Sequence, residues 1–443
     1  MLTHLRNARL FAPEARGVCD IVVAGERIVW IGGDGGDMDA GGDGVRAGER
    51  RGPRRAAVLD LPRALVAETI DLEGRTVVPG FIDGHVHLTG GGGEAGFRTR
   101  VPPLGLERYT RGGVTTAIGV LGTDDLVRTP ADVVATARGL IEEGLSAWCL
   151  TGGYHVPPAT ITGSVRGDIV HVDRIIGVGE VAVSDHRSSQ PTLDELLRLA
   201  SEAHVAGLMT GKAGVLHLHL GDGPRGLDMV RRALATAEIP PRAYHPTHVN
   251  RRKALFEEAL DVARAGCTID VTAFPVAERG GGGAGGGGRG GVAGDVDHLP
   301  AHGELGAMDG GDAADEWTAP EAIARYWDAG LPPERLTVSS DGGGCLPVFD
   351  ADGRVVRMGV GDLGALADTI AVLLAAGWPL ERVLPPFTSN VARHWRLPGK
   401  GTLVPGADAD LVVLDDAGRP MDVMARGIWY VRSGRVERPG TFA

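Results

Sequence analysis

The sequence predicts an α/β protein: a closed (β/α)8 barrel of the TIM type with a small β-sandwich domain built from both termini. Between residues 81 and 395, short apolar segments alternate with segments that repeat with the period of a helix. The apolar segments lack the polar alternation of half-exposed strands, so they indicate a parallel sheet that is covered on both faces. The length of this region and the number of its units favour a closed barrel over an open sheet.

The barrel domain, residues 81–395, contains strands and helices in turn. Besides the strand that leads into residue 85, we expect strands at 114–122, 145–153, 180–185, 214–221, 267–274 and 335–341. We expect helices at 192–207, 225–237, 252–266, 319–330 and 363–377. Thr192 with Glu195, and Thr318 with Glu321, have the spacing of the capping box and therefore mark two helix starts.

Residues 1–80 and 396–443 contain short apolar runs separated by glycine turns, and we expect them to form one β-sandwich domain beside the barrel. Residues 19–32 have the pattern of a hairpin with Gly25 at its turn. Two glycine-rich segments, 34–56 and 279–316, have too few apolar residues to pack in a core. We expect 279–316 to be a disordered surface insertion in the barrel domain, with a lid over the active site as the alternative.

Composition excludes several classes of protein. The formal net charge of −12 argues against a general nucleic-acid-binding protein. The chain has no apolar run long enough for a membrane span, and its first residues lack the apolar core of a signal peptide. Its four cysteines are scattered without CxxC spacing, which argues against a disulfide framework and a thiolate zinc site. These features predict a cytoplasmic protein that neither spans a membrane nor binds nucleic acid.

The segment GFIDGHVHL, residues 80–88, carries the clearest metal signal. His85 and His87 lie two residues apart, so on a strand both side chains point to the same face. Two imidazoles at the end of a barrel strand form half of a metal site. An isolated HxH is weak evidence, but here Asp83 precedes it and a glycine run follows it. The segment therefore predicts metal binding.

Other candidate ligands lie at the ends of later strands. In LHLHLGD, one of His217 and His219 is expected to bind metal, and His219 is favoured because it is nearer the carboxyl end of its strand. In HPTHVNR, His248 is favoured, and His245 is expected to be a loop residue or a support for the ligands. In TVSSDGGG, Asp341 is a candidate ligand, with the capping of a turn or helix as the alternative.

Glu180 is an acid within the apolar run IGVGEVAVSD, where an unpaired carboxylate would cost several kcal/mol. The candidate ligands together comprise imidazoles and two carboxylates, a donor set that suits zinc or a similar divalent ion. They are too many for one catalytic zinc, which normally takes three protein ligands. Two ions that share a bridging carboxylate and a hydroxide would use them all, and Glu180 is the natural bridge.

These segments resemble the amidohydrolase superfamily, and within it the family of isoaspartyl (β-aspartyl) dipeptidases. The resemblance extends over nearly the whole chain except the two glycine-rich segments. It implies that two zinc ions, bridged by Glu180 and a hydroxide, hydrolyse a β-aspartyl dipeptide substrate. It also implies a homo-oligomer, with an octamer as one candidate. The segments that carry it are GFIDGHVHLTGGGGEAG, TDDLVRTP, LTGGYHVPPATITGSVRGD, SDHRS, HLGD, PTHVNR and VSSDG.

The resemblance also implies a role for each matching residue. Asp341 would shuttle a proton to the leaving amine, and Tyr154 would stabilise the oxyanion. Glu94 would pair with the α-amino group of the substrate. The substrate carboxylates would be bound by Arg187 and Arg251, with Thr123 as a further substrate contact. The implied metal ligands are His85, His87, Glu180, His219, His248 and Asp341.

Two positions depart from the family pattern. Glu180 stands where better-known members carry a carboxylated lysine, and Cys345 stands where a substrate-contacting serine is expected. A thiol is a weaker hydrogen-bonding group than a hydroxyl, so Cys345 affects the expected substrate preference. One alternative function is that of another amidohydrolase, which acts on a cyclic amide or an N-acyl amino acid. A second alternative is a catalytically inactive scaffold of the same fold.

Overall fold

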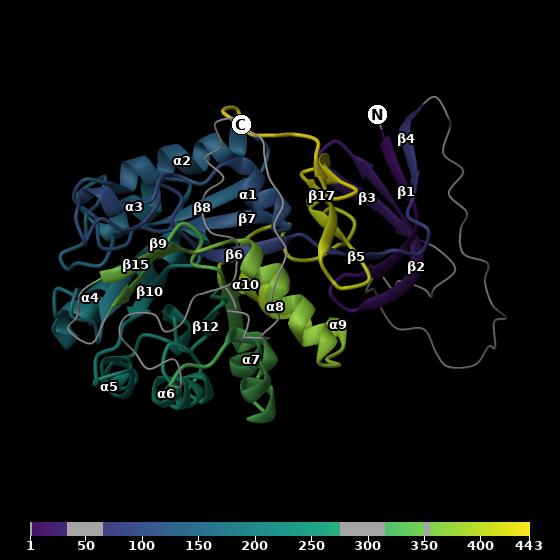
Figure 1. Cartoon of the computed structure of the whole chain (residues 1–443). Coiled ribbons are helices and arrows are strands. Elements are labelled where there is room, and N and C mark those ends of the chain that lie inside the picture. The colour runs from purple at the N-terminus through teal and green to yellow at the C-terminus, as the bar shows by residue number, and fades with distance from the viewer. Residues whose placement is uncertain (1, 33–64, 275–314, 350–354) are drawn as a thin grey trace.

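The computed structural model describes residues 2–32, 65–274, 315–349 and 355–443 (Figure 1). The glycine-rich segments 34–56 and 279–316 lie outside these residues, apart from positions 315 and 316. In the part of the chain that is described, every helix is too short or too polar to cross a membrane.

Eight parallel strands form the barrel, and this confirms the predicted fold class. The first six pair in chain order, β12 pairs with β13, and β13 packs against β6. A parallel bridge between Val86 and Gly342 joins the segment after β13 to β6 and so closes the ring. The strands are β6 (Phe81–Val86), β7 (Val114–Gly119), β8 (Ser146–Thr151), β9 (Ile175–Val183), β10 (Val215–Leu220), β11 (Tyr244–Thr247), β12 (Ile269–Thr272) and β13 (Leu336–Ser339).

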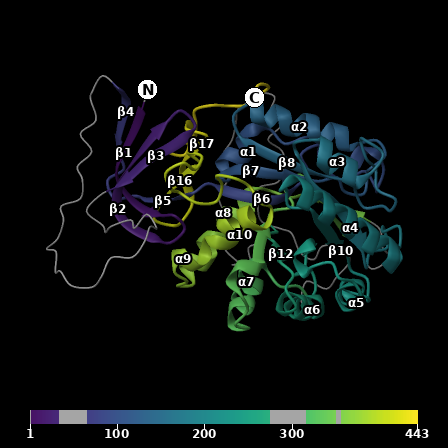
Figure 2. The same cartoon turned by 180° about the vertical axis from the view of Figure 1, so that it is seen from behind.

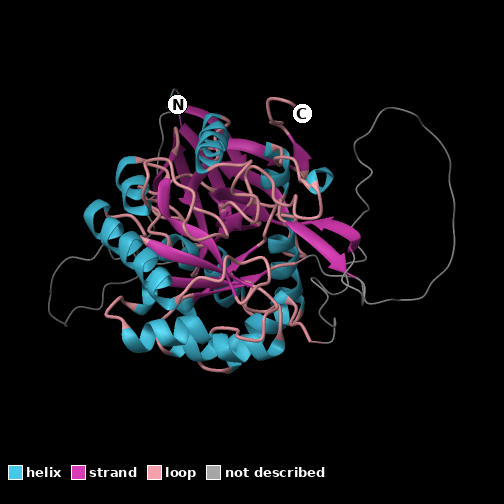
Figure 3. Cartoon of the chain, turned by 90° about the vertical axis from the view of Figure 1, so that its left-hand side faces the viewer, coloured by secondary structure: helices cyan, strands magenta, loops and turns pink. Residues whose placement is uncertain are grey.

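Helices lie around the outside of the strands (Figure 3). The five expected helices correspond to α4 to α8, and both predicted capping boxes are present. The sequence pattern missed β11 and the helices α1, α2, α3, α9 and α10. Thr129 with Asp132 forms a further capping box at the start of α2, and this spacing was a usable signal. The helices are α1 (Leu106–Arg111), α2 (Pro130–Glu142), α3 (Val165–His171), α4 (Leu193–Thr210), α5 (Asp228–Thr236), α6 (Lys253–Arg264), α7 (Ala319–Asp328), α8 (Gly364–Ala375), α9 (Leu380–Val383) and α10 (Ser389–His394).

Strands from both termini form one mixed sheet beside the barrel, as predicted (Figure 2). Its order is β19-β18-β17-β16-β5-β1-β2-β3, with β4 also paired to β1. β2 and β3 form the expected hairpin, and Gly25 at its turn has a φ of 56°. The strands are β1 (Leu2–Phe11), β2 (Ala15–Ala24), β3 (Arg27–Gly32), β4 (Val66–Asp71), β5 (Thr76–Pro79), β16 (Leu411–Leu414), β17 (Pro420–Ala425), β18 (Ile428–Arg432) and β19 (Arg435–Val436).

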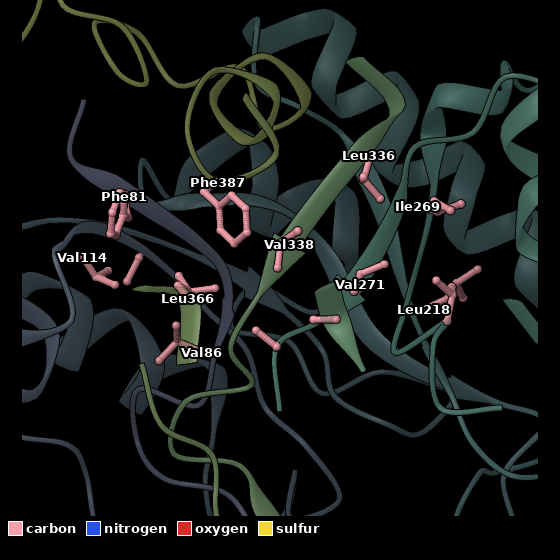
Figure 4. Close-up of a cluster of buried hydrophobic side chains, with 14 of the residues drawn as sticks. Phe81, Val86, Val114, Leu218, Ile269, Val271, Leu336, Val338, Leu366 and Phe387 are labelled. Atoms are coloured by element: carbon pink, nitrogen blue, oxygen red, sulfur yellow. The ribbon is translucent and has the colours of Figure 1, made fainter. Parts of the chain in front are cut away.

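The main hydrophobic core lies between the barrel strands and their covering helices. Val271 and Val338 on neighbouring strands belong to it together with Leu366 of α8 (Figure 4). Alternate residues of each strand face the other way, into the barrel. On β10 the leucines 216, 218 and 220 therefore belong to this core, whereas His217 and His219 contact side chains inside the barrel.

Candidate active site

Glu180 lies between two pairs of histidines. The first, the HxH pair, is His85 and His87, which β6 and the residue after it supply. The second, the split pair, is His219 on β10 and His248 just after β11. Each pair forms with Glu180 a group whose ligand atoms all lie within 4.8 Å of one another. The carboxylate of Glu180 thus belongs to two possible metal sites.

The two oxygens of the Glu180 carboxylate reach both pairs. Oε1 lies 3.4 Å from Nε2 of His87, and Oε2 lies 3.6 Å from Nε2 of His85. Oε2 also lies 2.9 Å from Nδ1 of His219 and 3.5 Å from Nε2 of His248. This arrangement is the one expected of a carboxylate that bridges two ions.

A local irregularity of β9 aims Glu180 into the barrel. Leu216 of β10 pairs with Val178, but Leu218 pairs with Val181, so β9 has one extra residue at this level. Such a bulge redirects a side chain and is common beside active sites. Gly179 has a φ of 143°, and a Cβ there would lie 2.5 Å from the carbonyl oxygen of His217. Only glycine therefore fits where β9 approaches β10.

Asp341 completes the predicted ligand set from the segment after β13. Its Oδ1 lies 3.1 Å from Nε2 of His87 and 3.5 Å from Nε2 of His85. Asp341 and His248 have φ angles of 54° and 60°, in the left-handed region. Such strain costs about 1–3 kcal/mol per residue and is typical of active sites, where the surrounding structure holds it.

The residues present fit a pair of divalent cations. Nε2 of His85, Nδ1 of His87 and Oδ1 of Asp341 are buried, and none has a hydrogen-bond partner among the described residues. Buried polar atoms are normally satisfied, so these atoms point to a ligand. A bound cation would satisfy Nε2 of His85 and Oδ1 of Asp341. Gly122 also leaves space here, because a Cβ at that position would lie 2.9 Å from the His87 ring.

The charges of the site favour an ionised bridge. Burial opposes ionisation of Glu180, but the nearby His85 and His219 hold the pKa of its carboxyl well below the usual range. Burial lowers the pKa of His85, but the Glu180 and Asp341 carboxylates together raise it to about 9. The protein therefore places concentrated negative charge against imidazoles, which is the environment of a cation site.

A cavity opens onto this cluster. Every residue predicted to contact substrate lines it, as do one member of each histidine pair, Glu180 and Asp341. The predicted residues that line it are His87, Glu94, Thr123, Tyr154, Glu180, Arg187, His219, Arg251, Asp341 and Cys345.

Asp185 anchors Arg187 at the wall of the cavity, and the sequence pattern missed it. Its carboxylate accepts hydrogen bonds from Nε of Arg187 at 3.1 Å and from Nη2 at 2.8 Å. It also lies 3.1 Å from Nε2 of His219. Arg187 in turn lies 3.5 Å from Glu94 and 5.6 Å from the ring of Tyr154. The SDHRS motif, with an acid two residues before an arginine, was the available signal.

Tyr154 places its hydroxyl beside the split pair, 2.9 Å from Nδ1 of His219. Burial and the Glu180 carboxylate raise the pKa of Tyr154 well above its ordinary value. The phenol therefore keeps its proton at neutral pH and can donate a hydrogen bond into the cavity.

His217 and His245, the histidines not favoured as ligands, lie deeper in the barrel. Nε2 of His217 is 2.8 Å from Nδ1 of His85. Burial and the nearby His85 hold the pKa of His217 well below its ordinary value. Neither residue belongs to the two groups that share Glu180.

Comparison with known proteins gives matches that extend over almost the whole chain. A family model described as the amidohydrolase family matches residues 76–430. The crystal structure of β-aspartyl dipeptidase from Fervidobacterium islandicum AW-1, in complex with β-Asp-Leu dipeptide, is 35% identical and has a TM-score of 0.78. The match covers 99% of this chain and 98% of that one.

Matches to curated relatives are weaker or shorter. An allantoinase from Rubrobacter xylanophilus is 25% identical over 367 residues, which are 79% of this chain and 77% of the allantoinase. An imidazolonepropionase from a Methylobacterium strain is 34% identical over 122 residues, 26% of this chain. The chain spans only 28% of that imidazolonepropionase and 34% of the one from Paenarthrobacter aurescens.

Proposed function

The chain belongs to the amidohydrolase family, and from this premise we propose that it hydrolyses β-aspartyl dipeptides at a binuclear metal centre. It is a homologue of β-aspartyl dipeptidase along 99% of its length. The observation that carries the proposal is Glu180, shared by two histidine pairs at the base of a cavity that also holds an acid and two arginines.

The proposed metal ligands are the HxH pair, the split pair, Glu180 and Asp341. Imidazole and carboxylate donors in a buried site favour zinc. When bound, two such ions supply a water of lowered pKa as nucleophile and polarise the scissile carbonyl.

Charge complementarity supports the dipeptide as substrate. A β-aspartyl dipeptide carries one ammonium and two carboxylates around its isopeptide bond. Glu94 would bind the ammonium, and Arg187 and Arg251 would each bind a carboxylate. Asp185 already holds the Arg187 guanidinium through two of its nitrogens, so little side-chain entropy would be lost when Arg187 binds substrate.

Two residues would manage the proton and the developing charge. Asp341 borders the cavity beside His87, where its carboxylate can take a proton from the attacking water and pass it to the leaving amine. Tyr154 keeps its phenolic proton and can donate it in a hydrogen bond to the carbonyl oxygen as negative charge develops.

The test compares β-Asp-Leu with α-Asp-Leu on zinc-loaded protein. We expect the β isomer to be cleaved and the α isomer to be left intact, because only the β linkage places all three charges against their partners. Cleavage of the α isomer alone, or of neither, would contradict the proposal.

The match to an allantoinase favours one second candidate, hydrolysis of a cyclic amide. A hydantoin ring carries no free α-ammonium, so Glu94 would have no partner in such a complex. We therefore expect no turnover of hydantoin or allantoin in the same assay, and turnover of either would favour this candidate.

We also propose that the enzyme is cytoplasmic and forms a homo-oligomer. These proposals follow from the sequence and from its resemblance to the isoaspartyl dipeptidases. Light scattering of the purified protein and fractionation of cells of the source organism test these two proposals.

A further inference from the structure

A row of buried polar side chains crosses the barrel beneath the HxH pair. It consists of His217, His245, Thr337 and Asp270, which come from β10, β11, β13 and β12, and each is at most 1% exposed. The proposed chemistry uses none of them. A buried polar group is costly unless it is hydrogen-bonded, so the row has either a structural or a functional reason.

The row is continuous from a proposed metal ligand to a carboxylate. Nδ1 of His85 lies 2.8 Å from Nε2 of His217, and Nδ1 of His217 lies 2.9 Å from Nδ1 of His245. Nε2 of His245 lies 3.0 Å from the Thr337 hydroxyl. That hydroxyl lies 2.7 Å from Oδ1 of Asp270.

The backbone sets the direction of the hydrogen bonds at His217. Its Nδ1 also lies 3.1 Å from the carbonyl oxygen of His245, and a carbonyl oxygen can only accept. Nδ1 of His217 therefore carries the proton. A neutral imidazole has one N–H, so its Nε2 accepts, and the donor is Nδ1–H of His85.

The hydrogen bonds at the Asp270 end of the row must run in the same direction. The Asp270 carboxylate accepts from the Thr337 hydroxyl, so the oxygen of Thr337 accepts from Nε2–H of His245. Nδ1 of His245 is then an acceptor, as the Nδ1–H of His217 requires. Asp270 is held in place by two further hydroxyls, those of Thr247 at 2.8 Å and Ser339 at 2.5 Å.

We propose that His217 is a positioning residue that fixes the tautomer of His85, so that the lone pair of Nε2 of His85 faces the metal centre. In the neutral form that binds a cation, His85 keeps its proton on Nδ1 and presents Nε2 toward Glu180 at 3.6 Å and Asp341 at 3.5 Å. Metal-binding histidines usually donate their other N–H to a carboxylate, carbonyl or water. Here a second imidazole accepts it, which explains why β10 carries two histidines on its inner face.

This inference rests on the proposed binuclear centre, so its test measures metal binding without substrate. His217→Phe keeps the ring volume but removes the acceptor, whereas His217→Gln keeps an acceptor oxygen. We expect His217→Phe to weaken the binding of one of the two zinc ions about 10- to 100-fold in chelator competition, and His217→Gln to restore most of the loss.

His394→Phe is the matched control, because the His394 ring packs in a tilted arrangement against His245, with ring centroids 4.1 Å apart, and lies outside the row. We expect it to bind both ions as the wild type does. Equal affinity of His217→Phe and wild type for both ions would overturn the inference. Failure of the wild type to bind two ions would instead overturn the proposed function.

A neutron diffraction map of the zinc-loaded wild type tests the tautomers directly and needs no variant. We expect deuterium on Nδ1 of His85, on Nδ1 of His217 and on Nε2 of His245. Deuterium on Nε2 of His217 would overturn the inference even if His217→Phe failed to fold.

Discussion

The two histidine pairs around Glu180 differ in origin and in what supports them. The HxH pair comes from one end of one strand, and behind His85 lies the imidazole of His217. The split pair comes from two strands, and behind His219 lies the carboxylate of Asp185. Asp185 also binds Arg187, a proposed substrate ligand, at 2.8 Å.

The two supports therefore act on different parts of the site. The row behind the HxH pair leads into the barrel interior, and its contacts are with other buried polar groups. The support behind the split pair leads to the cavity wall and joins a proposed metal ligand to the arginine that would hold a substrate carboxylate. Changes behind the HxH pair should therefore alter metal binding alone, whereas changes behind the split pair should alter substrate binding as well.

The largest effect should come from Glu180→Ala, which removes the group common to both pairs. We expect the variant to retain neither ion after gel filtration and to lose hydrolysis of β-Asp-Leu to the background rate. Elemental analysis and the dipeptide assay measure the two losses. Glu238→Ala, at an exposed glutamate, is the control. Retention of two tightly bound ions by Glu180→Ala would show that the pairs bind metal independently.

Asp185→Asn tests the link between the split pair and substrate. An amide cannot accept from both nitrogens of Arg187 as a carboxylate does, and hydrogen bonds to charged groups contribute about 1.5–3 kcal/mol. We expect KM for β-Asp-Leu to rise about 10- to 100-fold on protein saturated with zinc. A steady-state comparison with His217→Phe under the same saturation should show no such rise in KM for the latter. If both variants raised KM equally, the two supports would not be distinct.

Glu94→Gln acts further from the metal centre and should have a smaller effect. The side chain of Glu94 is 18% exposed and lies at the end of the chain of contacts that runs from His219 through Asp185 and Arg187. Loss of its charge should lower kcat/KM for β-Asp-Leu by about tenfold. This is near the lower end of what one hydrogen bond to a charged group contributes. N-acetyl-β-Asp-Leu, which lacks the ammonium, provides the control. Wild type and variant should cleave it equally. An equal loss of kcat/KM on both substrates would mean that Glu94 does not bind the ammonium.

Sequence patterns predicted the HxH pair more readily than the split pair, for a physical reason. His85 and His87 share a face because of strand geometry alone, so their proximity needs no knowledge of the fold. His217 and His219 have the same spacing as His85 and His87, but only one of them is expected to bind metal. Which one it is depends on how deep each lies in the barrel, and the spacing does not show this. The rule that barrel chemistry occurs at the carboxyl ends of strands favoured His219, and the structure places this residue beside Glu180.

Features that depend on tertiary contacts were missed. Asp185 was not singled out as a site residue, because its partner His219 lies on another strand. The four-residue strand β11 contains Pro246, which disrupts the usual strand pattern. The barrel as a whole was predictable because its strands are apolar on both faces and alternate with strongly periodic helices.

The last prediction concerns Glu180 as the bridging ligand, and it is that bicarbonate has no effect on the native enzyme. Glu180 carries its own carboxylate, whose oxygens lie 2.9 Å from His219 and 3.4 Å from His87. A lysine at this position could bridge only after its amine had reacted with carbon dioxide. We therefore expect bicarbonate to change neither the rate nor the extent of reactivation when zinc is returned to the metal-free enzyme. Glu180→Lys provides the contrast, because any activity that it regains should require bicarbonate. A bicarbonate dependence of the native enzyme would mean that a group other than Glu180 joins the two histidine pairs.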